Sequence, residues 1–343
     1  MRGSLGLLAL SYLGFVSLGL PDSILGAAWP SIRTDLGLRL DAAGPLILLA
    51  TLGTTISSTF SGRLLSPWST AVVLVGSTAC ASLALFGFAF APSWTFMLAA
   101  SILAGLGGGA IDAALNGFVA RHYDVRHMNW LHGCWGIGAT LGPLTLAAML
   151  SADHGWRATY RVLGAIELLL VLAFVFTARH WPRPAPHEAG TSTRVRLTPA
   201  MRGRIAFFFL YGGLEAGAGL WSTSFLIEQK GASTSAASTI VGIYWGGLMV
   251  GRFVIGALTS RFGAARLVRW SVRAACAATI VLVLPCPLPL AAAAFVAFGL
   301  SLAAIYPTVM HETPHEFGDD AARHLVGYQI AAGSLGIATL PWL

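Results

Sequence analysis

Residues 93–120 read SWTFMLAASILAGLGGGAIDAALNGFVA, a run of 28 residues in which Asp112 is the only charged side chain. A helix needs about 20 mainly apolar residues to cross a bilayer, so this run is long enough to span one. Its glycines, such as those at 107–109, permit close packing on a neighbouring helix. A carboxylate at membrane depth is costly, which marks Asp112 as a functional candidate.

Ten other apolar runs of comparable length accompany this one. Together they predict an all-α membrane protein with eleven transmembrane helices. The predicted spans are residues 4–29, 41–65, 70–91, 93–120, 128–150, 157–180, 203–228, 234–260, 265–285, 287–311 and 324–343.

The composition of the 343-residue chain excludes a soluble protein. Hydrophobic residues make up 56% and charged residues 10%, and the mean hydropathy is +0.72, whereas soluble domains carry about 25% charged residues. The net charge of +7 comes from arginines in the gaps between apolar runs, which argues against nucleic-acid binding. The four cysteines have no metal-ligand spacing, so we expect no disulfide framework, no metal and no cofactor.

A polar segment rich in proline and arginine divides the apolar runs into six and five. We predict an N-terminal six-helix bundle at 1–180, a cytoplasmic linker at 181–202 and a C-terminal five-helix bundle at 203–343. With the N-terminus in the cytoplasm, fifteen of the 21 basic residues fall on inner segments and five on outer segments, while Arg252 lies inside a span. Since cytoplasmic segments are enriched in Lys and Arg, this bias predicts the orientation.

The two halves repeat with an offset of 194 residues. This offset places Gly53 on Gly247, Gly105 on Gly299 and Asp112 on Tyr306. Parallel repeats of this kind occur in membrane proteins whose two halves enclose a site near the bilayer midplane. A repeat of six plus six helices would leave the twelfth helix missing, so we expect a truncated version of a longer protein.

The loop between predicted helices eight and nine, GALTSRFGAAR at 256–266, resembles the G-x-L-x-D-R-x-G-R-R loop of the major facilitator superfamily. Ser260 stands at the Asp position of that loop. Through topology and repeat the resemblance covers the whole chain. It implies the major facilitator fold, with two pseudo-symmetric helical bundles of six and five transmembrane helices, and a secondary transporter.

A narrower resemblance is to the fucose permease group of sugar–proton symporters. It rests on GLPD at 19–22, GLGGGAIDAALN at 105–116 and NWLHGCWGIGA at 129–139. In that group an acid in helix one and an acid in helix four serve coupling and substrate binding, which the resemblance carries to Asp22 and Asp112. Asn116 matches a helix-four Asn, while His132 and Trp135 stand where the group has Gln or another polar residue, so all three are assigned to substrate binding.

Further residues suit a polar site inside the membrane. Glu215 lies near the repeat-equivalent depth of Asp22, and Tyr306 aligns with Asp112, so both are assigned to substrate binding. Glu167 and Arg252 are charged residues within spans that either act in function or pair with a neighbouring helix. Four tryptophans either stack on a sugar ring or pack between helices: Trp29, Trp135, Trp221 and Trp245.

One motif points to a different class. His311-Glu-Thr-Pro-His315 matches the H-E-x-x-H signature of zinc proteases. That chemistry needs both histidines on one face of an unbroken helix, and Pro314 removes a helical hydrogen bond. We therefore expect a loop here, and we expect the chain to be neither a membrane-embedded metalloprotease nor any other enzyme.

Two transport functions remain open. The first is proton-coupled symport of a small polar solute, a sugar, by alternating access, with Asp22 and Asp112 carrying the proton. The second is proton-coupled efflux of drugs or metabolites, which Gly138-x-x-x-Gly142-Pro143 favours by partly matching the antiporter signature. The expected partners are the solute, protons and the lipid bilayer, without nucleic acid. We expect a monomer in a bacterial cytoplasmic (inner) membrane.

Overall fold

The computed structural model describes residues 4–64, 70–123, 125–181 and 197–342, and within these ranges some side chains at helix ends lie outside the description. The chain divides into two compact units, unit 1 at Met1–Gly190 and unit 2 at Thr191–Leu343. Most of the predicted linker at 181–202 lies outside the described residues, so the predicted domain boundaries stay predictions.

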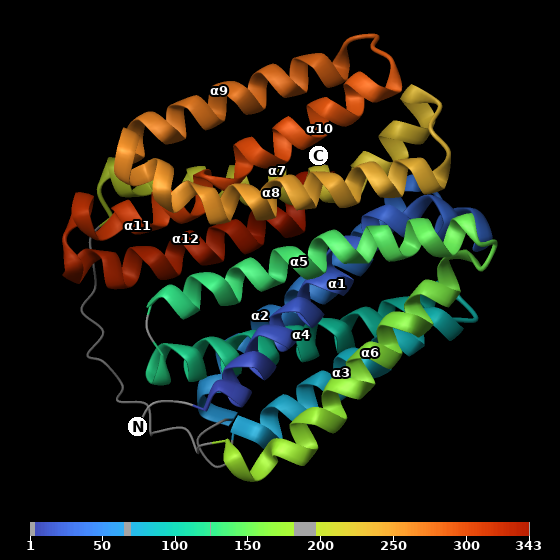
Figure 1. The fold of residues 1–343 in the computed structure, drawn as a ribbon, viewed down its shortest axis with the longest axis horizontal. Coiled ribbons are helices and arrows are strands. Elements are labelled where there is room, and N and C mark those ends of the chain that lie inside the picture. The colour runs from blue at the N-terminus through green and yellow to red at the C-terminus, as the bar shows by residue number, and fades with distance from the viewer. Residues whose placement is uncertain (1–3, 65–69, 124, 182–196, 343) are drawn as a thin grey trace. The chain divides into compact units, whose positions relative to one another are not determined.

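All regular structure in the described residues is helical (Figure 1). Unit 1 contains α1 Leu5–Asp35, α2 Ala43–Leu64, α3 Thr70–Phe90, α4 Trp94–His122, α5 Val125–Ser151 and α6 Gly155–Thr177, with short 3₁₀ turns at Leu40–Ala42 and Ala178–His180. Unit 2 contains α7 Pro199–Lys230, α8 Thr234–Phe262, α9 Ala264–Val283, α10 Leu288–Ala303, α11 Ile305–Phe317 and α12 Asp319–Thr339, with a 3₁₀ turn at Leu340–Trp342.

The predicted helices are confirmed, with one break. The tenth predicted span is two helices, α10 and α11, which meet at Ala304 and together form one apolar segment, Leu288–Phe317. Within the described residues, nine segments are long and apolar enough to cross a membrane, and α9 and α12 are not among them. Every apolar run of the sequence therefore contains a helix.

Helix ends follow local side-chain chemistry. Before α4, the Ser93 hydroxyl accepts the Phe96 backbone N–H at 3.4 Å, and before α7 the Thr198 hydroxyl accepts that of Met201 at 3.3 Å. Such caps satisfy N–H groups that the first turn leaves without a partner. At the other end of α7, Gly231 adopts a φ of 67°, a left-handed conformation that glycine adopts without steric cost.

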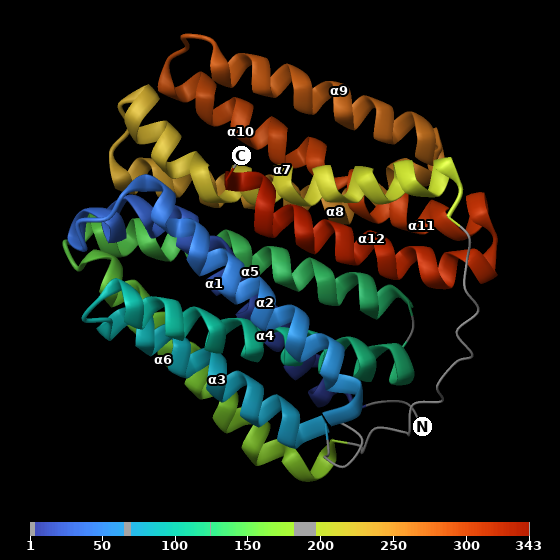
Figure 2. The ribbon, with the colours of Figure 1, turned by 180° about the vertical axis from the view of Figure 1, so that it is seen from behind.

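The same helix pairs pack in each unit. In unit 1, α2 lies on α4, α1 on α5, and α3 on both α4 and α6 (Figure 2). In unit 2, α8 lies on α10, α7 on α12, and α9 on α10. A Cβ atom at Gly105 would overlap the carbonyl oxygen of Ala50, and one at Gly299 would overlap that of Tyr244. Gly105 and Gly299 are 194 residues apart, and so are Ala50 and Tyr244. The sequence repeat therefore corresponds to a repeated backbone contact.

A second pair of contacts extends the repeat. A Cβ atom at Gly138 of α5 would overlap the carbonyl oxygen of Val16 in α1, and one at Gly336 of α12 would overlap that of Phe209 in α7. Val16 and Phe209 are 193 residues apart, which is also the separation of Asp22 and Glu215, whereas Gly138 and Gly336 are 198 residues apart. The equivalence of Asp22 and Glu215 therefore rests on their positions in α1 and α7, and the glycines of α5 and α12 do not keep the same offset.

Candidate functional site

Unit 1 holds an acidic site on three helices. Asp22 lies in α1, where its carboxylate accepts the indole N–H of Trp135 from α5 at 2.8 Å. Asp112 lies in α4 and accepts the side-chain amide of Asn116 at 3.0 Å. The two carboxylates interact electrostatically. Neither forms an ion pair with Lys or Arg in the part of the chain that the structure describes.

Glycine packing brings Trp135 to Asp22. A Cβ atom at Gly19 would lie 2.6 Å from the backbone nitrogen of Ala139, so α1 and α5 touch backbone to backbone at this level. Asp22 follows Gly19 by three residues, which is about one helical turn. Small residues at a helix crossing permit this close approach. The GLPD segment at 19–22 therefore supplies both the glycine of the α1–α5 contact and the acid one turn later.

His132 lies on the same helix as Trp135, one turn earlier. It is exposed at the surface of unit 1, and its ring meets that of Phe15 edge-on at 5.4 Å. The structure thus places four of the predicted residues, Asp22, Asp112, Asn116 and Trp135, in two hydrogen-bonded pairs, with His132 next to one of them. An indole, an amide and an imidazole can hydrogen-bond a solute hydroxyl.

Unit 2 holds a second polar cluster. One carboxylate oxygen of Glu215 in α7 accepts the hydroxyl of Tyr211, and the other lies 3.6 Å from the Arg252 guanidinium of α8. The Glu215 and Arg252 side chains are 16% and 21% exposed. The ring of Tyr306, at the start of α11, lies 6.0 Å from that of Tyr211. Of the two roles left open for Arg252, the structure shows the pairing with a neighbouring helix, through Glu215.

Sequence reasoning missed two tyrosines in this cluster. Tyr211 precedes Glu215 by four residues, and residues at this spacing meet on one helix face, so its position was a usable signal. Tyr244 of α8 is fully buried, interacts electrostatically with Glu215 and Arg252, and its hydroxyl has no hydrogen-bond partner among the described residues. Only packing reveals Tyr244, because its neighbours come from distant parts of the chain.

Most of the proposed stacking tryptophans are structural. The indole of Trp29 donates to the Leu40 carbonyl at 2.9 Å, and that of Trp221 donates to the Pro341 carbonyl at 2.8 Å. Trp245 is buried against Gly219. Trp135 alone among the four predicted tryptophans contacts one of the predicted site carboxylates through a hydrogen bond that the structure describes.

Glu167 of α6 lies apart from both clusters. Its side chain is buried in unit 1 close to Ser17 of α1, and its Oε2 has no hydrogen-bond partner among the described residues. Glu167 therefore meets a neighbouring helix, α1, which is the second of its two predicted roles.

The H-E-x-x-H segment is helical, which corrects the expectation of a loop. His311 and His315 lie in α11, with ring centroids 5.4 Å apart, and Pro314 lies within the helix. The proline is tolerated because α11 ends three residues later, so little helix follows the lost hydrogen bond. Within the described residues, no group of three or more His, Cys, Asp or Glu is placed to hold a metal ion.

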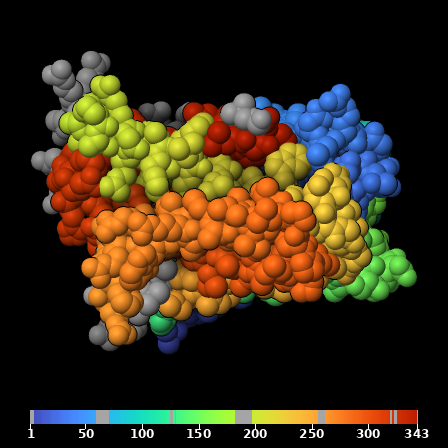
Figure 3. Space-filling view, turned by 90° about the horizontal axis from the view of Figure 1, so that it is seen from above, coloured from blue at the N-terminus to red at the C-terminus, as the bar shows by residue number. Residues whose placement is uncertain are grey.

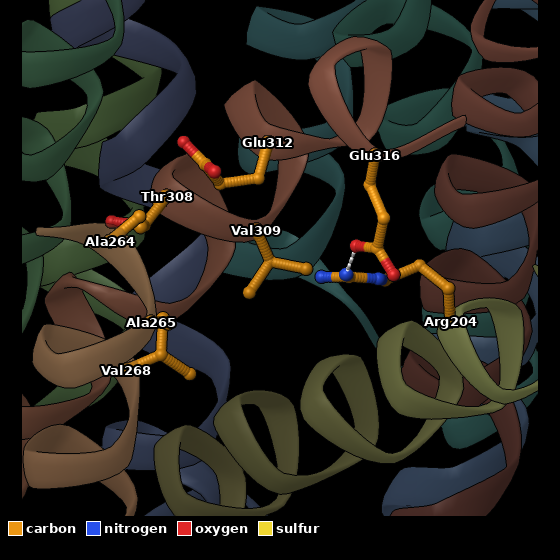
Figure 4. Close-up of a pocket in the computed structure, with 8 residues that line it drawn as sticks. All are labelled: Arg204, Ala264, Ala265, Val268, Thr308, Val309, Glu312 and Glu316. Carbon is orange, nitrogen blue, oxygen red and sulfur yellow. Dashed lines mark hydrogen bonds and ion pairs between the residues drawn. The ribbon is translucent and has the colours of Figure 1, made fainter. Parts of the chain in front are cut away.

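The same helix lines a pocket of about 280 Å³ in unit 2 (Figure 4). Arg204 of α7 forms an ion pair with Glu316 of α11 at one side of this pocket, and Glu312 lies on the next turn of α11. Glu312 also lies 3.5 Å from His311. The single acid of the protease-like motif, Glu312, therefore lines the same pocket as the Arg204–Glu316 ion pair, which joins α7 to α11.

These features define an all-helical membrane protein built from two repeats with an acid in the first helix of each. The Major Facilitator Superfamily model matches residues 11–341, so the chain belongs to this family, and it is an integral multi-pass membrane protein. The family comprises transporters and not enzymes. The loop resemblance at 256–266 includes side chains outside the described residues.

Individual relatives are distant. The glucose/mannose transporter GlcP of Bacillus subtilis (strain 168) is 22% identical over 240 residues, which cover 66% of this chain and 59% of GlcP. Bypass of stop codon protein 6 of Saccharomyces cerevisiae is 23% identical over 279 residues, covering 72% of this chain and 56% of that protein. The chain thus spans less than two thirds of either length. The solved nucleoside transporter NupG superposes with a TM-score of 0.72 at 15% identity, covering 98% of this chain and 88% of NupG.

Proposed function

We propose that this protein is a secondary active transporter that moves a small polar solute, a sugar, in symport with protons. The observation that carries this proposal is the pair of carboxylates, Asp22 and Asp112, in a membrane unit whose described residues give them no cationic partner. Two like charges in a membrane repel each other and lose hydration, so protonation of one relieves both costs. The name of GlcP, a glucose/mannose transporter, supports a sugar as the solute.

The hydrogen bond from Trp135 to Asp22 offers a route from protonation to conformation. The indole N–H donates to an ionised carboxylate more strongly than to a neutral acid. Proton uptake at Asp22 therefore weakens a contact between α1 and α5 and releases a donor for a solute hydroxyl. Because a bound proton then favours one arrangement of the helices over another, protonation shifts the population of the two states of alternating access.

The remaining site residues are proposed to bind the solute. In unit 1 the candidates are Asn116, His132 and Trp135, and in unit 2 they are Glu215 and Tyr306. Sugars carry hydroxyl groups that both donate and accept, so the amide, imidazole and indole of unit 1 suit them, as do the carboxylate and phenol of unit 2. We further propose a monomer in a bacterial inner membrane with a cytoplasmic N-terminus, whose partners are the solute, protons and lipid and not nucleic acid.

Reconstituted protein in proteoliposomes tests the proposal. An inwardly directed proton gradient should drive accumulation of one member of a sugar panel, and the solute should evoke proton entry. Asp112→Asn should abolish both, since an amide does not titrate in this range. Asp153→Asn, at an exposed acid between α5 and α6, is the matched control and should transport normally. Accumulation that ignores the proton gradient, or that survives both Asp22→Asn and Asp112→Asn, contradicts the coupling scheme.

Proton-coupled efflux is the second candidate, and the glycines of α5 are its supporting observation. Gly138 and Gly142 both pack on α1, as the partial antiporter motif requires. However, α12 packs on α7 through Gly333 and Gly336 in the same manner. The glycine contact therefore belongs to both units and does not favour efflux. A lipophilic cation that evokes proton counterflow, with no response to sugars, would select the antiporter.

A further inference from the structure

Three arginines of α9 share one exposed face. Arg266, Arg269 and Arg273 are all exposed, and with Trp270 they fall within an arc of about 100° on the helix. The residues that α9 buries, Leu267, Ser271, Ala275, Ala278 and Leu282, lie on the other side, toward α10. Figure 3 shows α9, in orange, at the surface of unit 2. This arginine face therefore points away from the packing core of its unit.

The repeat provides an internal reference for this face. The helix that corresponds to α9 at the 194-residue offset is α3. The two helices bury residues at four matching positions, which are Ser77 and Ser271, Ala81 and Ala275, Ala84 and Ala278, and Phe88 and Leu282. At the positions of the three arginines, α3 carries Val72, Val75 and Ala79. The fold thus accepts apolar residues here, and the arginines of α9 are not a requirement of helix packing.

Among the described side chains, the arginine face has no acidic partner. The sequence of α9 contains no Asp or Glu, and none of the three arginines forms an ion pair with an acidic side chain among the residues that the structure describes. The face extends from Arg266 to Arg273, about 10 Å along the helix. Arginines on the lipid-facing side of a membrane protein extend their charged groups toward the interface, where a counter-charge stabilises them.

We propose that Arg266, Arg269 and Arg273 form a binding site for the phosphate head groups of anionic phospholipids. Guanidinium groups bind phosphate oxygens through paired hydrogen bonds, and the surface potential of anionic lipids attracts basic residues close to the membrane. Trp270, which is 45% exposed on the same face, is of the type that concentrates at the level of lipid head groups. The site does not depend on the proposed transport function.

The test measures lipid binding by the full chain. Purified protein in a neutral detergent is titrated with phosphatidylglycerol or phosphatidylcholine, and bound lipid is counted by native mass spectrometry. The native protein should retain phosphatidylglycerol over phosphatidylcholine, and raised salt should reduce that preference. Since each basic residue contributes about a fivefold gain in affinity, replacing all three by Gln should weaken phosphatidylglycerol binding by more than tenfold.

Two further triple variants and one competing anion serve as controls for this measurement. The Lys triple variant keeps the charge and should retain most of the binding. Arg121→Gln, Arg179→Gln and Arg202→Gln together remove the same charge from exposed arginines elsewhere and should leave binding unchanged. At matched ionic strength, inorganic phosphate should displace the lipid no more than chloride does, because it lacks the acyl chains that hold a phospholipid at the protein surface. Undiminished binding by the Gln triple variant, an equal loss in the control variant, or stronger displacement by phosphate than by chloride would each overturn the proposal.

Discussion

The two units use one packing scheme and two different chemistries. Gly138 on Val16 in unit 1 corresponds to Gly336 on Phe209 in unit 2, backbone to backbone. At the equivalent acids the units differ, because Asp22 accepts an indole N–H whereas Glu215 meets a tyrosine hydroxyl and Arg252. Small residues at helix crossings therefore preserve the fold, while the polar side chains between those crossings are free to give each unit its own charge.

The largest expected effect comes from breaking the shared packing. Gly138→Leu and Gly336→Leu each place a side chain where a backbone carbonyl of the neighbouring helix lies. Each should cost more than about 3 kcal/mol, because backbone cannot move aside as a side chain can. Gly76→Leu is the control, since no atom lies within 4 Å of a Cβ at that position.

Thermal unfolding followed by size-exclusion chromatography measures this effect. The two packing variants should show little monodisperse protein, and Gly76→Leu should resemble the native protein. If only one packing variant loses the folded protein, the two crossings are not equivalent in energy.

The second prediction separates the charges of the two units. Arg252→Gln leaves Glu215 without its cation in a site where both side chains are less than a quarter exposed, so it should cost about 3 kcal/mol. Asp22→Asn leaves no cation behind and should cost less than about 1 kcal/mol. The double variant Arg252→Gln, Glu215→Gln should recover most of the loss, as thermal unfolding can show. Equal losses for Arg252→Gln and Asp22→Asn would contradict this asymmetry.

A third change transfers the charge pattern of unit 2 to unit 1. Ser58 stands at the 194-residue offset from Arg252, so from the repeat we predict that Ser58→Arg supplies unit 1 with a matching cation. A fixed positive charge close to a carboxyl group favours its ionised form. Proton-driven accumulation should fall by about tenfold or more, which corresponds to about 1.4 kcal/mol of lost coupling. Exchange of labelled for unlabelled solute should persist, and unchanged accumulation would argue against the equivalence of the two positions.

The last prediction compares one basic residue in each unit that binds backbone carbonyl groups at a helix end. In unit 1, Arg157 binds Asp35 and the carbonyls of Ala89 and Ala91, whereas in unit 2 Lys230 binds the Leu284 carbonyl. Arg157→Gln should lower stability by about 1–2 kcal/mol, and Lys230→Gln by less than about 1 kcal/mol, because it loses fewer and more exposed contacts. Chemical denaturation in detergent measures the loss of stability of each variant. A larger loss for Lys230→Gln than for Arg157→Gln would contradict the prediction.

Sequence patterns located the helices better than they located their ends. The first span was predicted to end at 29, whereas α1 continues to Asp35 through Arg33 and Thr34. Hydropathy indicates which residues suit the interior of a bilayer. A helix can extend beyond those residues into water, because its backbone hydrogen bonds remain satisfied there. For the same reason α11 keeps its helical form through Pro314, where local rules predicted a loop.

The sequence by itself determined the all-helical membrane fold, the repeat and the two equivalent acids, because these depend on composition and periodic spacing. Only the tertiary structure decided which group each acid meets. Trp135 lies 113 residues from Asp22, and Arg252 lies in a different helix from Glu215, so their contacts depend on how glycine crossings set the distance between helices. A contact between residues far apart in the chain leaves no local sequence pattern, whereas the burial of apolar residues gives each helix a recognisable apolar run.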